Sequence, residues 1–123
     1  MKALMIGALM ALAISAARGG EDLYSANYIL PGCKAWLASV SKSPIPIYRK
    51  DSRTEYCVTA VYGFTARISD NWKCADIPHP VTIDQIVSVV VQYIDARPNR
   101  MHERFRTLAF EALSDAWPCR KLP

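Results

Sequence analysis

Apolar residues recur every three or four positions in four stretches of this 123-residue chain, which is the spacing of an amphipathic helix. The first stretch runs from Ser25, a residue type favoured at helix N-caps, to about Val40. Pro31-Gly32 interrupts it. We therefore expect this helix either to kink there or to start its regular part at Pro31, because proline suits the first turn. Residues 41–50 contain two prolines and predict a loop.

A capping box opens the second stretch. Ser52 and Glu55 have the spacing at which each side chain can accept a hydrogen bond from the other residue's backbone N–H. Helical spacing continues beyond them, and this helix is expected to end near residues 69–71. Residues 69–80 are then predicted to form a loop.

Another capping box, formed by Thr82 and Gln85, opens the third stretch, which Pro98 ends. β-Branched residues dominate positions 86–94, and their propensity favours a strand. The polar positions of this stretch nevertheless recur every three or four residues, and the run 89–91 of three valines breaks any two-residue alternation. The pattern therefore predicts a helix.

The fourth predicted helix starts at Asn99 or a neighbouring residue and continues to about Ala116. Its apolar residues cover a wider arc than one neighbouring helix can bury. Taken together, the four stretches predict an all-α protein, a small bundle of four main helices.

The first 17 residues have a different character. They consist of a short positive start at Lys2, an uncharged apolar run over residues 3–14, and small residues at 15–17, which are the parts of a secretory signal peptide. A membrane-spanning helix needs roughly 20 apolar residues, so we expect no integral membrane segment in the mature form. The expectation is thus a periplasmic protein with one domain over residues 25–119.

Four cysteines, Cys33, Cys57, Cys74 and Cys119, lie in the expected mature chain. An even number in a small exported protein predicts two disulfides. A zinc site is the rival interpretation, but no pair has the close C-x-x-C spacing, so no metal is expected. Sequence alone allows three pairings. The simplest one joins the two helical cysteines as Cys33–Cys57 and the two in irregular segments as Cys74–Cys119.

The composition argues against several functions. The formal net charge is +4, but no basic run is interleaved with stacking aromatics, so nucleic acid is not an expected partner. Only His79 and His102 could serve as a base at neutral pH, and neither has a nucleophile in a recognisable motif beside it. We therefore expect no enzyme activity and no cofactor.

Binding is better supported by individual side chains. Trp72 lies beside Cys74, so it is either a rigid interface anchor or a side chain folded back onto the core. His79, between two prolines, is expected to be exposed. Arg97, Arg100 and Arg104 cluster around the start of the fourth helix, as a solvated face or as a patch that steers an acidic partner.

Several motifs of residues 56–119 resemble those of the Tai-type immunity proteins of bacterial type VI secretion, the resistance-associated immunity proteins paired with peptidoglycan amidase effectors. The matching pieces occur in order: Cys57…Gly63, Cys74, Val81-Thr82-x-x-Gln85-x-Val87, Val90-Val91-x-Tyr93-Ile94, Pro98, His102 and Ala112-Leu113-x-x-Ala116-Trp117-Pro118-Cys119. One departure is Ala60, where the family has an aromatic residue. The resemblance implies a periplasmic all-α protein that binds a secreted peptidoglycan amidase and occludes its active site.

Two other interpretations remain. A small periplasmic stress chaperone of the HdeA type is also exported, helical and disulfide-linked, but the basic balance of this chain gives little support to an acid-triggered switch. An orphan envelope protein that binds some other partner is the second. The sequence leaves the oligomeric state open, a homodimer included.

Overall fold

The computed structural model describes residues 22–42, 51–64, 68–70 and 73–119. The elements in chain order are α1 (Ala26–Val40), α2 (Ser52–Tyr62), β1 (Ile68–Asp70), β2 (Lys73–Ala75), α3 (Ile83–Asp95), the short 3₁₀ helix η1 (Pro98–Arg100) and α4 (Phe105–Ala116). The predicted all-α fold with two disulfides is confirmed. In the described part of the chain, no helix has both the length and the apolar character that a membrane span requires. The predicted signal peptide lies outside the described residues.

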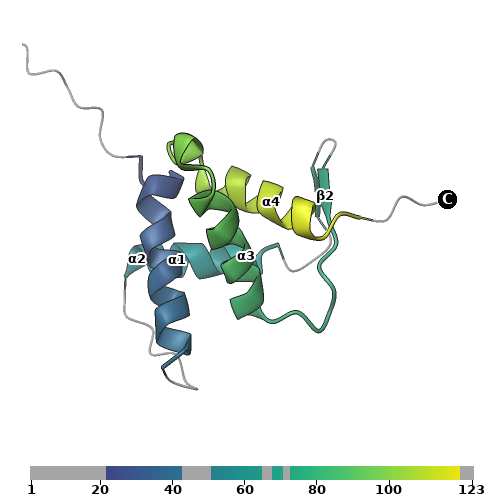
Figure 1. The fold of residues 1–123 in the computed structure, drawn as a ribbon, viewed down its shortest axis with the longest axis horizontal. Helices are drawn as coiled ribbons and strands as arrows, with labels where there is room; N and C mark the ends of the chain where they lie inside the picture. The colour runs from purple at the N-terminus through teal and green to yellow at the C-terminus, as the bar shows by residue number, and fades with distance from the viewer. Residues whose placement is uncertain (1–21, 43–50, 65–67, 71–72, 120–123) are drawn as a thin grey trace, which may run out of the picture.

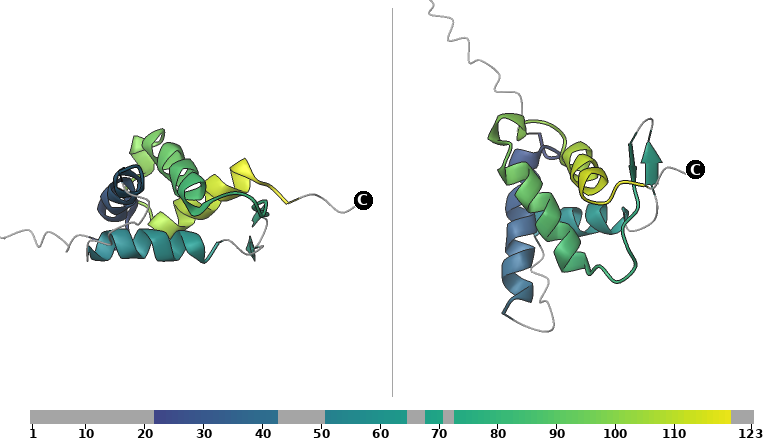
Figure 2. Two further views of the ribbon diagram at one scale, coloured as in Figure 1. Left: turned by 90° about the horizontal axis from the view of Figure 1, so that it is seen from below. Right: turned by 45° about the vertical axis from the view of Figure 1, so that its right-hand side comes forward.

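The four α-helices pack around one apolar core. α1 and α3 lie side by side, and α2 crosses behind both of them (Figures 1 and 2). α4 packs against α3 and against β2 (Figure 1). The largest fully buried side chains come from all four helices and include Ile29, Val61, Val90 and Phe105. The run of three valines lies in α3, with Val90 and Val91 buried, so the helix that the polar spacing predicted is confirmed.

The local start signals of α1 and α3 are confirmed. Ser25 is the N-cap of α1, and its hydroxyl accepts a hydrogen bond from the backbone N–H of Tyr28 at 3.3 Å. Thr82 is the N-cap of α3, and both hydrogen bonds of the capping box with Gln85 are present. α1 runs from Ala26 through Pro31. The alternative in which its regular part starts at Pro31 is therefore wrong.

α2 differs from the prediction at both ends. Its N-cap is Asp51, whose carboxylate accepts a hydrogen bond from the backbone N–H of Arg53 at 2.9 Å, so the predicted cap at Ser52 was wrong by one residue. The helix ends at Tyr62 and not near residues 69–71. Gly63 has low helix propensity, and the turn at this position buries the ring of Phe64.

The predicted loop over residues 69–80 contains a small sheet. β1 pairs with β2 in antiparallel register, with Ser69 opposite Cys74. The loop prediction is therefore wrong for the residues of these strands, while residues 76–82 lie outside any helix or strand. The disulfide between Cys74 and Cys119 holds the second strand against the segment after α4.

α4 begins at Phe105, so the predicted start at Asn99 was wrong. The first two backbone N–H groups of α1 donate to the carbonyl oxygens of Glu103 and Met101, at 2.9 and 2.8 Å. In return, the N–H of Phe105 donates to the carbonyl oxygen of Tyr24 at 2.8 Å. The starts of α1 and α4 thus satisfy each other's unpaired backbone groups. This pairing requires the segment before α4 to leave the helical path.

Two disulfides connect elements that are distant in sequence. Cys33 and Cys57 are fully buried and join α1 to α2, with their Cα atoms 5.5 Å apart. Cys74 and Cys119 join β2 to the segment after α4, with their Cα atoms 5.4 Å apart. Beside the second disulfide, the backbone N–H of Asp76 donates to the carbonyl oxygen of Trp117 at 2.8 Å. The chain that leads from β2 into α3 is therefore anchored to the end of α4.

Candidate partner-binding surface

Arg100 forms two ion pairs within the protein. Its guanidinium forms an ion pair with Glu103, with Nε 2.6 Å from a carboxylate oxygen, and a second one with Glu111 through Nη1 at 2.7 Å. The hydroxyl of Tyr93 donates to the same Glu111 carboxylate at 3.1 Å. Hydrogen bonding to Arg100 lowers the pKa of Glu103, while burial and the hydrogen bond to Glu111 raise the pKa of Tyr93. This network ties the segment after α3 to the middle of α4.

Arg97 packs against the same tyrosine. Its Cζ atom lies 3.6 Å from the centroid of the Tyr93 ring, which is cation–π geometry. Its Nη1 also donates to the carbonyl oxygen of Tyr93 at 2.9 Å. The structure therefore brings Arg97 and Arg100 together around Tyr93, where both stabilise the α3–α4 connection.

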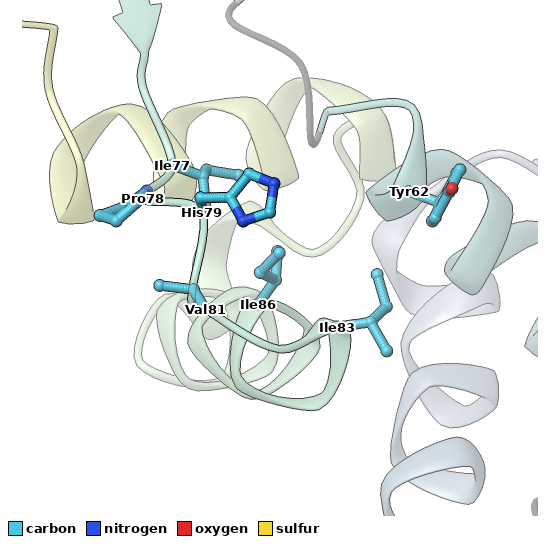
Figure 3. Close-up of a pocket in the computed structure, with 7 residues that line it drawn as sticks. All are labelled: Tyr62, Ile77, Pro78, His79, Val81, Ile83 and Ile86. Carbon is cyan, nitrogen blue, oxygen red and sulfur yellow. The ribbon is translucent and has the colours of Figure 1, made fainter.

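A pocket with a volume of about 380 Å³ lies between the end of α2, the segment after β2 and the start of α3. His79 lies over the pocket, and Tyr62 stands across from it on α2 (Figure 3). Ile86 is buried, whereas His79 and Tyr62 are exposed. We call this the His79 pocket, and its lining is Tyr62, Ile77, Pro78, His79, Val81, Ile83 and Ile86.

The His79 pocket combines aliphatic side chains with exposed polar surface. Its lining is mainly aliphatic, and an imidazole and a phenol provide the polar groups at its edge. The segment that carries His79 is fixed at both ends, by Cys74 in a disulfide and by Thr82 in the α3 capping box. The pocket is therefore formed before any partner arrives, which lowers the entropic cost of binding.

A second pocket, of about 450 Å³, contains Arg104. Arg104 occupies the N-cap position of α4, and its side chain is exposed. The ring centroids of Tyr24 and Tyr56 lie 5.6 Å apart at this pocket. We call it the Arg104 pocket, and its lining is Tyr24, Tyr56, Arg104, Arg106 and Thr107.

The structure separates the residues that the sequence suggested as contacts. His79 and Arg104 line different pockets, and Arg97 and Arg100 lie at neither. Trp72 lies outside the described residues. Within the described ranges, no three His, Cys, Asp or Glu side chains gather in a way that could hold a metal ion.

Sequence reasoning missed the tyrosines at both pockets. Tyr62 is 68% exposed and Tyr24 55% exposed, which is unusual for large aromatic side chains. Tyr62 falls beside the apolar positions of α2, and Tyr24 precedes the first helix. Neither position carries a periodic signal, so only the tertiary structure reveals their exposure.

Comparison with known proteins relates the chain to a family of immunity proteins. A family model described as Rap1a immunity proteins matches residues 20–119. This range includes the described helices and strands, both disulfides and both pockets. No curated protein and no solved structure matches the chain.

Proposed function

The chain belongs to the Rap1a immunity protein family, whose members protect against type VI secretion effectors, and we propose that it is a periplasmic protein that binds and inhibits a peptidoglycan amidase effector. The family match over residues 20–119 is the observation that carries this proposal. The amidase as target follows the resemblance to the Tai-type proteins. The periplasm is supported by the signal-peptide pattern of residues 1–17 and by two disulfides, which form in oxidising compartments.

The protein is proposed to act by occupying the effector's active site, with no chemistry of its own. Inhibition of this kind needs a rigid surface with preformed pockets. The His79 pocket meets this requirement, because the segment carrying it is anchored to the end of α4 and to the start of α3. We assign this pocket to an apolar side chain of the effector and keep Trp72 and Arg104 as further proposed contacts. Arg97 and Arg100 also remain proposed contacts, because both are partly exposed while they contact Tyr93 and Glu111.

Co-purification from periplasm tests the proposal. A tagged mature protein should capture one peptidoglycan amidase at equal stoichiometry. A general chaperone would instead hold many clients loosely at acid pH. Capture of many proteins, or of none in a strain that produces the amidase, would contradict the proposal.

A charged residue in the His79 pocket tests the contact surface. Ile83→Asp places a carboxylate at the first residue of α3, where acidic residues favour a helix. Because Ile83 is also half-buried against the core, affinities are compared only after thermal unfolding has shown that the variant is folded. Burying that charge against an apolar partner group should weaken binding by about a hundredfold. Ala35→Asp introduces the same charge on the exposed face of α1 and should leave binding unchanged. Equal affinities of the two variants would exclude the His79 pocket from the interface.

A further inference from the structure

The charged side chains that line the Arg104 pocket are all positive. Arg104 and Arg106 both line it and are both exposed, and its lining contains no carboxylate. This contrasts with Arg100, whose charge is neutralised by Glu103 and Glu111 inside the molecule. A pocket with one sign of charge attracts groups of the opposite sign and raises their association rate.

The start of α4 departs from ordinary helix chemistry. α2 and α3 each begin with a capping side chain and have an acidic residue in the first turn, Glu55 and Asp84 respectively. α4 has Arg104 at its N-cap, without a side-chain hydrogen bond, and no acidic residue in its first turn. Cations at the positive end of a helix are destabilising. These arginines therefore oppose the stability of α4, which is expected where residues serve binding.

Two tyrosines give the pocket a fixed wall. The ring of Tyr56 packs against the fully buried ring of Phe105, with centroids 6.4 Å apart, and against Tyr24. The backbone carbonyl of Tyr24 is held by the N–H of Phe105. Tyrosine and arginine are enriched, with tryptophan, among the residues that dominate protein interfaces, and side chains held in place lose little entropy on binding.

We propose that the Arg104 pocket binds an acidic surface loop of the effector, with an Asp or Glu carboxylate of that loop paired to Arg104 and Arg106. The tyrosine rings pack against the neighbouring part of the loop. This assignment rests on the proposed function, since it takes the occupant to be the inhibited effector. Charge complementarity selects an acidic partner, because the lining offers two guanidinium groups and no anion of its own.

Binding kinetics with a purified peptidoglycan amidase effector test the pocket. Arg104→Glu and Arg106→Glu should each weaken affinity by about tenfold or more, mainly by slowing association, and should reduce the dependence of affinity on salt. Lys42→Glu is the matched control, because it makes the same charge change at the opposite end of α1 from the pocket. It should bind as the wild type does. Thermal unfolding confirms that each variant is folded.

The outcomes distinguish failure of the pocket assignment from failure of the proposed function. If the wild type binds the amidase and the Arg104, Arg106 and Lys42 variants bind equally well, the pocket assignment is wrong and the proposed function stands. If the wild-type chain is a dimer that Arg104→Glu converts to a monomer, the occupant is a second copy, which also overturns the assignment. If the wild type binds no amidase, the proposed function fails.

A peptide probe tests the pocket without the effector. The ¹⁵N-labelled protein is titrated with a synthetic Asp- and Glu-rich heptapeptide and with its Asn- and Gln-rich counterpart. The acidic peptide alone should shift the backbone amide signals of Tyr56, Arg106 and Thr107. No shift, or equal shifts with both peptides, would show that the pocket does not select acidic chains.

Discussion

Gly32 is buried where α1 crosses α2, and the structure leaves no room there for a side chain. A Cβ atom at this position would lie 2.4 Å from the backbone carbonyl carbon of Arg53 and 2.5 Å from the backbone nitrogen of Thr54. Backbone atoms cannot rotate away, so the clash would force the two helices apart. Close packing of α1 against α2 therefore explains the glycine of the Pro31-Gly32 pair, which interrupts the helical pattern in the sequence.

Gly32→Ala should lower the free energy of unfolding by about 1–3 kcal/mol, the usual cost of an overpacked site. Gly63→Ala is the control, because a Cβ there would meet only the carbonyl oxygens of Ala60 and Thr59, at 3.4 and 3.6 Å. Urea unfolding measures both variants. Equal stabilities of the two would show that α1 and α2 do not approach each other as closely as described.

The carboxylate of Glu103 links stability to pH. Its pKa in the folded protein is lowered by hydrogen bonds from Arg100. The unfolded chain therefore binds its proton more readily, and the stabilising contribution is present above the unfolded pKa of about 4.3 and is lost as the pH falls through the lower folded value. Hydrogen bonds from Arg53 act on Asp51 in the same direction.

Glu103→Gln should therefore lower the unfolding temperature at pH 6 and have progressively less effect as the pH falls towards 2. Scanning calorimetry across this range measures the difference from the wild type. Asp76→Asn, at an exposed position of the segment after β2, is a control that should follow the wild-type curve. A difference that stays constant from pH 6 to pH 2 would mean that the Arg100–Glu103 pair does not contribute through its charge.

At the scale of elements, helix boundaries that depend on neighbouring residues could be predicted from the sequence. Boundaries that depend on contacts between distant segments could not. Ser25 and Thr82 cap helices as the sequence indicated, because a cap requires only residues a few positions apart. The start of α4 depends on a hydrogen bond from Phe105 to Tyr24, which is far away along the chain. The end of α2 depends on the burial of Phe64 against Phe110, with ring centroids 5.9 Å apart. No local pattern contains these contacts.

The position of the α2 cap is a direct test at this scale. Asp51→Ala should lower the unfolding temperature by several degrees, because it removes the acceptor for the backbone N–H of Arg53 and the ion pair with its guanidinium. Ser52→Ala should have little effect, since Ser52 is the first residue inside the helix and exposed. The reverse order of the two effects would restore the Ser52–Glu55 capping box as the start of α2.

At the scale of the whole molecule, each disulfide joins segments that are distant in the sequence. They close separations of 24 and 45 residues in the chain. In the chain-entropy model, closures of this length stabilise a protein by roughly 3.5 and 4 kcal/mol. Both values are large beside the 5–15 kcal/mol stability that is typical of a protein domain.

Replacing a disulfide pair by alanines should therefore lower the free energy of unfolding by about 2–4 kcal/mol for either pair. The Cys74–Cys119 replacement should in addition weaken effector binding, since this disulfide anchors the segment that carries His79. The Cys33–Cys57 replacement removes a link in the α1–α2 core, away from the lining of the His79 pocket, and should affect stability more than affinity in the folded protein. Equal losses of affinity at matched folded fractions would contradict this division of roles.

The candidate site was predictable only in part. Sequence named His79 and Arg104, which line pockets, because a histidine between prolines and a cluster of arginines stand out along the chain. It also named Arg97 and Arg100, whose side chains contact Tyr93 and Glu111 and line neither pocket. The direction of a long side chain depends on partners from other elements. The sequence therefore could not separate the arginines that stabilise the fold from those that face solvent.

We propose that this protein inhibits a peptidoglycan amidase by binding it in a fixed ratio. The most direct test is titration of a purified type VI amidase effector, at a concentration well above the dissociation constant, with the mature disulfide-linked protein while peptidoglycan cleavage is measured. Activity should fall linearly and reach zero at one inhibitor per active site. Undiminished cleavage in the presence of excess protein would contradict it.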